Sequence, residues 1–223
     1  MSDAAQRDAL VALGRSLFDR GLTHGSTGNL SVRTAEGFVM TPTGSSLGSL
    51  DPVRLAILDG NGVHVRGDSP TKEAALHLAM YRERSRDRAV VHLHSTHSVA
   101  VSILEDTDPS NALPALTAYY AMRIGTLPML PYFPPGDASL AAAVGRSAAR
   151  HHAMLLANHG PVVSGSTLAA AADAIEELEA TARLWLLLRG ERLRVLTPAQ
   201  VDALANHAMG SQEGWSSTGG DTH

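Results

Sequence analysis

The stretch that decides the fold is AVVHLHSTHSVAV, residues 89–101, an apolar run interrupted by three histidines. On a β-strand, side chains two residues apart point to the same face, so His92 and His94 project together while Val91 and Leu93 face the other way. One face can then pack against apolar groups, and the other carries two imidazoles about 6 to 7 Å apart. We therefore predict a buried strand whose polar face offers two ligands to one metal ion.

The metal is not the only interpretation, because paired buried histidines can also be satisfied by hydrogen bonds to the backbone or to carboxylates. A third candidate ligand is His159, which ends the apolar run LLAN before Gly160-Pro161, where we expect the chain to turn at a sheet edge. Three histidines leave a position open around zinc or a similar divalent ion, as in catalytic sites. The direction of His97, past a strand-to-helix turn, stays open.

Glu73 is the carboxylate that we expect to move protons beside such an ion. It stands at the start of a predicted helix, just before the histidine strand. A glutamate in the first turn of a helix is also favoured by the helix dipole alone, so its position has a purely structural interpretation as well.

The spacing of apolar and turn residues predicts the remaining elements. Helices are expected over 4–20, 71–84 (with Thr71 as a possible N-cap), 138–150, 167–189 and 198–209; hairpins or paired strands are expected over 30–41, 55–67 and 152–165. The proline-rich segment 111–137 is expected to be an irregular loop with short strands. We predict one α/β domain over residues 1–210 with a mostly antiparallel central sheet, followed by a polar tail over 211–223.

Composition narrows the function. With 44% hydrophobic and 18% charged residues the chain should fold, and a net charge of -4 gives no basic field for nucleic acid. Without cysteine, a metal must bind to histidine, carboxylate or backbone oxygen. No signal peptide and no membrane-spanning run is evident, so a cytoplasmic protein without membrane contact is expected.

Two loops rich in glycine and hydroxyl groups are candidate anion sites. GSTGNLS (25–31) and TPTGSS (41–46) offer backbone NH groups and allow close approach, so they can hold a phosphate without a P-loop lysine. They match no nucleotide-binding motif, and plain turns remain the alternative.

Five motifs, in order along the chain, resemble those of the class II aldolase/adducin family: STGNLSVR, TPTGSS, PTKEAALH, VHLHSTHS and NHGPVVSG. The resemblance implies a three-layer α/β/α domain and a divalent ion, usually zinc, on His92, His94 and His159, with Glu73 as acid/base that also reaches the metal. It further implies that the substrate phosphate is bound by a set of loop residues: Gly28, Asn29, Thr43, Gly44, Thr71 and Lys72.

Within the family the chain is most similar to the 3-oxo-tetronate 4-phosphate decarboxylases, through LPALTAYYAMRIGTLPMLPYFPPGD and through TKE where sugar-phosphate aldolases usually have two serines before the glutamate. The implied reaction yields dihydroxyacetone phosphate and carbon dioxide through an enediolate, whose charge a cation stabilises. Tyr119 or Tyr120 is the expected proton donor to carbon. A homotetramer with active sites between subunits is also implied.

Three alternatives remain open. A fuculose- or ribulose-phosphate aldolase would pass through the same enediolate and release an aldehyde. Lys72, the only lysine, is a possible Schiff-base nucleophile in a metal-free aldolase. Adducin-type relatives use the fold as an interaction module, although they would be expected to lose the metal histidines.

Overall fold

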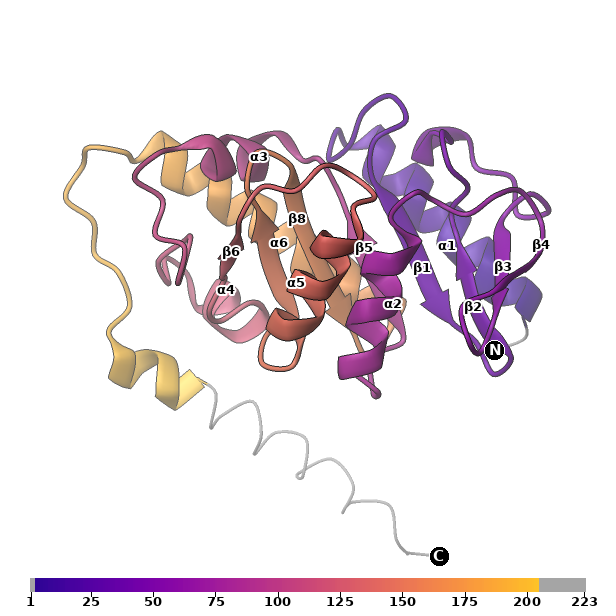
Figure 1. Ribbon diagram of the computed structural model, residues 1–223. Coiled ribbons are helices and arrows are strands. Elements are labelled where there is room, and N and C mark those ends of the chain that lie inside the picture. Colours follow the sequence, from indigo (N-terminus) through magenta and orange to yellow (C-terminus); the bar gives the residue numbers. More distant parts are fainter. Residues whose placement is uncertain (1–2, 205–223) are drawn as a thin grey trace, which may run out of the picture.

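The computed structural model describes residues 3–204 as a central sheet between two layers of helices (Figure 1). The strands are β1 (Asn29–Arg33), β2 (Gly37–Met40), β3 (Ala56–Asp59), β4 (His64–Arg66), β5 (Ala89–His92), β6 (Met129–Leu130), β7 (Ala153–Leu156) and β8 (Gly160–Gly165). Their order in the sheet is β4-β3-β2-β1-β5-β8-β7-β6. Every neighbouring pair is antiparallel except β6 and β7, which confirms the predicted sheet.

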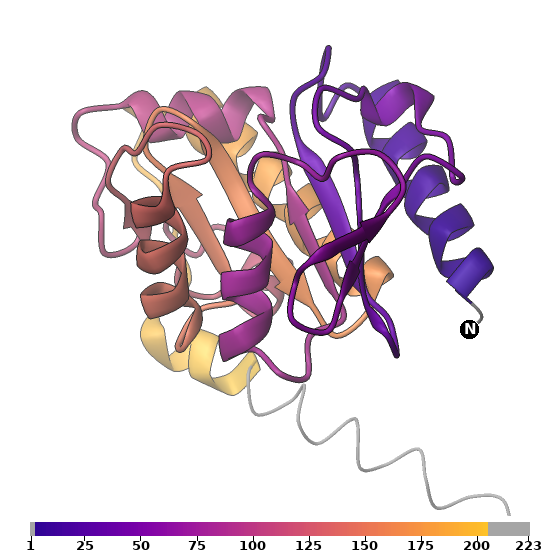
Figure 2. The same cartoon turned by 45° about the vertical axis from the view of Figure 1, so that its right-hand side comes forward.

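The helices are α1 (Asp3–Asp19), α2 (Ala74–Glu83), α3 (Thr96–Ile103), α4 (Ala118–Arg123), α5 (Ala138–Ala148) and α6 (Leu168–Leu187), with a short 3-10 turn η1 (Leu47–Ser49). Figures 1 and 2 show α2 and α5 side by side on one face of the sheet and α1 and α6 on the other. The three-layer α/β/α architecture is therefore as predicted. No helix within residues 3–204 is both long and apolar enough to cross a membrane.

The alternation of side chains along the central strands divides the core in two. Ala89 and Val91 of β5 join the apolar cluster that packs against α1, α4 and α6. Val90 joins the second cluster, which packs against α2 and α5. By the same period of two, His92 projects towards the α2 side, where it is fully buried. The polar face expected of this strand is thus the face that α2 covers.

Two predictions about the histidine strands are wrong in detail. β5 ends at His92, and His94 lies in the short connection that leads into α3. The chain also reverses before Gly160 rather than at Gly160-Pro161, because Asn158 adopts the left-handed conformation (φ 55°) in the β7–β8 turn. β8 is an interior strand, since both β5 and β7 pair with it.

Thr71 is not the N-cap of α2, which begins at Ala74 with Glu73 in the cap position. The Thr71 hydroxyl instead accepts a hydrogen bond from the Glu73 NH at 3.2 Å. The segment 111–137 is not purely irregular, because it contains α4, which Thr117 caps by accepting from the Tyr120 NH. Residues 198–204 are helical. The rest of the helix predicted over 198–209 and the polar tail lie outside the described residues.

Gly160 allows β8 to approach the segment that carries His94. A Cβ added at Gly160 would lie 2.3 Å from the Leu93 carbonyl oxygen, at a backbone φ of 156°. We expect Gly160→Ala to lower the free energy of unfolding by about 1 to 3 kcal/mol, measured by denaturant titration, and to weaken metal binding. Gly21→Ala is the matched control, because Gly21 also has a positive φ (74°) but nothing lies within 4 Å of its added Cβ. Equal losses in both variants would contradict the role of the close approach.

Candidate metal centre and active site

The structure brings together four side chains that are far apart in the sequence. Glu73 precedes α2, His92 ends β5, His94 follows it, and His159 closes the β7–β8 turn. One ligand atom from each of these residues lies within 4.8 Å of the corresponding atoms of the others. The sequence predicts the three histidines as ligands, two from one strand and His159 from a turn. The antiparallel pairing of β5 with β8 places His159 beside the other two.

The separations within the cluster match those of ligands around one ion. His92 Nε2 lies 3.3 Å from His159 Nε2 and 3.3 Å from Glu73 Oε2. His159 Nε2 lies 3.3 Å from Glu73 Oε1. A tetrahedron with metal–ligand bonds of about 2.0 to 2.1 Å has edges of about 3.3 to 3.4 Å. These atoms are therefore spaced as donors that share a centre.

The hydrogen bonding of His92 directs a lone pair into the cluster. Its Nδ1 lies 2.9 Å from the Pro161 carbonyl oxygen, which can only accept. Nδ1 therefore carries the hydrogen and Nε2 is free to act as a ligand. The main chain of β8 thus fixes the tautomer that a metal site requires.

Burial keeps the other imidazoles unprotonated. Burial, followed by the influence of His92, lowers the pKa of His94 to about 3 and that of His159 to about 4. Burial acts in the opposite direction on Glu73, but His92, the hydrogen bond from Asn29 and His159 outweigh it, so the pKa of this carboxyl group lies below its ordinary value. Near neutral pH His94 and His159 are therefore neutral and Glu73 is a carboxylate, the protonation states that bind a divalent ion.

One atom of the cluster has no hydrogen-bond partner among residues 3–204. Glu73 Oε1 is buried and makes no hydrogen bond there, although His159 Nε2 lies 3.3 Å from it. A buried carboxylate oxygen without a partner is costly, and a cation between Glu73 and the imidazoles would satisfy it. The donor set of three imidazoles and a carboxylate suits zinc and similar ions, so these residues fit a divalent metal.

The predicted phosphate loops lie beside the cluster. The loops that contain Thr43 and Thr71 run next to each other, since the Thr43 NH donates to the Ser69 carbonyl at 3.0 Å and the Thr71 NH donates to Thr41 at 3.1 Å. Thr43, Gly44 and Lys72 are exposed. Lys72 directly precedes the cluster residue Glu73, and the backbone bonds above tie the Thr43 loop to the same segment, although the Thr43 NH is already engaged.

The other two predicted phosphate residues face inward. Gly28 has a φ of 77°, and a Cβ added there would lie 3.0 Å from the His92 carbonyl oxygen, so glycine lets this loop reach the end of β5. The Asn29 side chain is buried and donates from Nδ2 to Glu73 Oε2 at 2.8 Å. Asn29 is thus positioned to orient the carboxylate.

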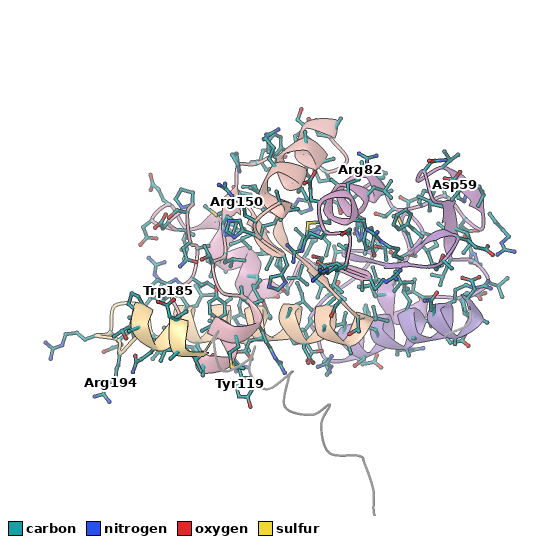
Figure 3. All side chains as sticks on the ribbon, turned by 90° about the horizontal axis from the view of Figure 1, so that it is seen from below. Asp59, Arg82, Tyr119, Arg150, Trp185 and Arg194 are labelled. Carbon is teal, nitrogen blue, oxygen red and sulfur yellow. The ribbon has the colours of Figure 1, made fainter. Side chains whose placement is uncertain are left out.

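The structure does not bring the two tyrosines to the cluster. Tyr120 is fully buried among the core residues on the α6 side of the sheet, and its hydroxyl lies 3.5 Å from the Leu113 carbonyl. Tyr119 is 62% exposed, and Arg123 stacks on its ring at 5.4 Å. In Figure 3, Tyr119 projects outward from the α6 layer, on the opposite side of the sheet from Arg82 of α2. Of these two tyrosines, Tyr119 is therefore the one that another molecule can contact.

Sequence reasoning missed a hollow that opens beside the cluster. It has a volume of about 440 Å³ and is lined partly by His94 and His159. His24, Tyr132 and Asn158 are also part of its wall. These residues come from three separate loops, and apart from Asn158, which directly precedes His159, no local pattern links them to the histidines. This hollow gives a small substrate access to the cluster.

Glu179 of α6 also escaped sequence analysis. Its carboxylate accepts hydrogen bonds from the backbone NH groups of His97 and Ser98, both at 2.9 Å, at the first turn of α3. A partly buried carboxylate that accepts from the first NH groups of a helix stabilises that end of the helix. Glu179 therefore anchors α3 directly after His94, and His97 points to Glu179 rather than into the metal cluster.

Comparisons with known proteins identify a matching family, similar proteins and a similar solved structure. The family described as Class II Aldolase and Adducin N-terminal domain matches residues 8–186. The 3-oxo-tetronate 4-phosphate decarboxylase of Haemophilus influenzae is 49% identical over 207 residues, which cover 92% of this chain and 99% of that protein. An L-fuculose phosphate aldolase of the same organism is 35% identical over 78% of this chain and 79% of its own. The crystal structure of YgbL from Escherichia coli superposes with a TM-score of 0.89 at 44% identity, covering 91% of this chain and 99% of YgbL.

Proposed function

Because the chain belongs to the class II aldolase and adducin family, we propose that it is a carbon-carbon lyase that decarboxylates 3-oxo-tetronate 4-phosphate to dihydroxyacetone phosphate and carbon dioxide. The observation that carries the proposal is the buried cluster of Glu73, His92, His94 and His159. The decarboxylase from Haemophilus influenzae, at 49% identity over nearly its whole length, supports this choice of reaction.

The chemistry divides between the ion and the protein. A bound divalent ion, which we propose to be zinc, supplies a Lewis acid that stabilises negative charge on substrate oxygens. As carbon dioxide leaves, the electrons of the broken carbon-carbon bond form the enediolate, and a proton added at carbon then gives dihydroxyacetone phosphate. Glu73, ionised and buried beside the histidines, exchanges a proton with the substrate hydroxyl.

The phosphate and the carbon proton require groups outside the cluster. We propose that the loops around Thr43-Gly44 and Thr71-Lys72 hold the phosphate, with the exposed Lys72 as a cationic partner. Gly28 and Asn29 support the inner wall of this site. The proton on carbon comes from a tyrosine, and Tyr119 is the better candidate because Tyr120 is buried in the core.

An exposed Tyr119 can reach an active site only in another subunit, so the proposal includes a homotetramer with active sites at subunit interfaces. We also propose a cytoplasmic location and a single domain over residues 1–210, with a polar tail after it. Nucleic acid and membranes are not proposed partners.

The second candidate function is that of a sugar-phosphate aldolase. It is favoured by the L-fuculose phosphate aldolase that is 35% identical over 78% of this chain. The enediolate is the same in both reactions, and only the leaving group differs. A metal-free aldolase that uses Lys72 is disfavoured because a Schiff-base lysine usually lies in a desolvated pocket, whereas Lys72 is exposed.

The deciding experiment is a substrate comparison with the metal-loaded protein. We expect carbon dioxide and dihydroxyacetone phosphate in equal amounts from 3-oxo-tetronate 4-phosphate, and little aldehyde from fuculose or ribulose phosphates. Aldehyde without carbon dioxide would establish the aldolase instead. Borohydride trapping with substrate tests Lys72, since only an imine gives a stable adduct.

A further inference from the structure

A continuous chain of buried hydrogen bonds leads away from Glu73 between α2 and the sheet. Glu73 Oε2 accepts from Asn29 Nδ2 at 2.8 Å, and Asn29 Oδ1 lies 2.5 Å from His77 Nε2. His77 Nδ1 lies 2.7 Å from the Ser31 hydroxyl, which lies 2.9 Å from the Tyr81 hydroxyl. The residues of this relay beyond Glu73 are Asn29, His77, Ser31 and Tyr81.

The relay lies in an otherwise apolar interface. His77 and Ser31 are completely buried and Tyr81 nearly so, among core residues such as Leu76 and Met80. Buried polar groups cost free energy unless all their partners are in place, and an apolar interface would be simpler to pack. Neither His77 nor Tyr81 has a part in the proposed reaction, so their presence calls for another explanation.

Elementary hydrogen-bond chemistry fixes the direction of every bond in the relay. An ionised Glu73 only accepts, so Asn29 must present its NH2 group to it and its oxygen to His77. An amide oxygen also only accepts, so His77 Nε2 must carry a hydrogen. His77 is completely buried in an apolar interface and no carboxylate among residues 3–204 contacts its ring nitrogens, so a charged ring would be costly there; we take the ring as neutral, with Nδ1 bare. Nδ1 therefore accepts from Ser31, which in turn accepts from Tyr81.

We propose that His77 is a positioning residue, locked in its Nε2–H tautomer by Ser31 and Tyr81, that holds the Asn29 amide with its NH2 group towards Glu73. Without the His77 donor, the Asn29 amide can rotate and offer its oxygen to the carboxylate, which repels it. Glu73 would then lose the bond that sets its orientation beside the histidines. The catalytic consequence rests on the proposed function, whereas the tautomer of His77 does not.

The arrangement on α2 supports this role. Glu73 and His77 are four residues apart, so they lie on the same face of the helix start, directed at the sheet. On β1, Asn29 and Ser31 are two residues apart and therefore share the face that α2 covers. At the far end, Arg33 stacks on the Tyr81 ring at 4.9 Å and donates to the Tyr81 carbonyl, which holds Tyr81 in place. Starting from Glu73, the hydrogen-bonded residues therefore come alternately from α2 and its N-cap and from β1.

The first test reads the tautomer directly. In protein labelled with 15N-histidine, long-range 1H–15N correlation spectra distinguish a protonated ring nitrogen from a bare one. We expect the resonances that disappear in His77→Gln to show a protonated Nε2 and a bare Nδ1 across the neutral pH range. The opposite tautomer, or a charged ring, would overturn the proposal. This result does not depend on which reaction the enzyme catalyses.

The second test uses activity and metal binding of matched variants. His77→Leu removes the donor, and we expect kcat to fall about 10- to 100-fold with little change in KM, as for outer partners of metal sites. His77→Gln keeps an NH2 group near the Nε2 position and should recover most of this loss. Combining His77→Leu with Asn29→Ala should cost little more than Asn29→Ala alone, because His77 acts through Asn29. Additive losses, or failure of the glutamine variant to recover activity, would contradict the proposal.

Met80→Ala separates positioning from folding. Met80 is fully buried on the same helix and in the same core cluster but is not a member of the relay. We expect it to lower Tm while the folded protein keeps its kcat. A decrease in kcat equal to that of His77→Leu would show that general loosening of α2 explains both. If the parent enzyme released no carbon dioxide, the proposed function would fail, and the tautomer spectrum would still decide the proposal about His77.

Discussion

Replacing His159 with alanine is expected to remove the metal and to lower kcat/KM by at least about a thousandfold. A Lewis acid contributes several kcal/mol of charge stabilisation in the transition state, and each 1.4 kcal/mol is a factor of ten in rate. This variant keeps His92 and Glu73, whose Nε2 and Oε2 atoms lie 3.3 Å apart. The ligand that the β7–β8 turn contributes is lost.

The measurement combines metal content with turnover. Elemental analysis after dialysis should give about one ion per chain for the parent and much less for His159→Ala, and saturating zinc should restore little activity. His64→Ala is the matched control, because His64 is an exposed histidine on the edge strand β4. This control should keep both its metal and its rate. A His159→Ala variant that retained a full complement of metal and near-normal turnover would remove the cluster from the mechanism.

Most of the candidate metal site could be predicted from sequence because local rules bring its residues together. Alternation along β5 sends His92 to the face opposite Val91, which is a consequence of strand geometry alone. The two-residue spacing predicts His94 on the same strand, whereas β5 ends at His92 in the structure; the short connection into α3 still brings the His94 side chain to the cluster. The position of His159 depends on the pairing of β5 with β8, which lies beyond the reach of local periodicity.

The tyrosines and the relay show where sequence reasoning stops. The prolines of 111–137 predict an irregular loop. In the structure Thr117 caps α4 within this segment, and Tyr120 of α4 is buried in the core. His77 gave a usable signal, since it stands one helical turn after Glu73, on the same face. Its partners on β1 could not be identified, because which strand lies beneath α2 is a property of the whole sheet. Long-range packing, rather than local propensity, decides these contacts.

Glu73→Gln is expected to keep the metal and to lower kcat by about 10²- to 10⁴-fold, the usual contribution of a general acid or base. The glutamine has nearly the same shape and still accepts a hydrogen bond from Asn29, and the three histidines remain as ligands. What it loses is the ability to take up and return a proton. Metal affinity should fall only modestly, because the three histidine donors are unchanged and only the charge of the fourth donor is lost.

Stopped-flow or steady-state turnover, with metal content measured on the same samples, distinguishes this effect from simple loss of the ion. Glu83→Gln is the matched control, since Glu83 is the last residue of the same helix and is exposed. It should have the parent rate. Normal turnover by Glu73→Gln would remove Glu73 from the acid/base role and leave it as a ligand alone. Slow turnover with empty sites would instead mean that its main task is to hold the metal, because the charge of the carboxylate would then be what the ion requires.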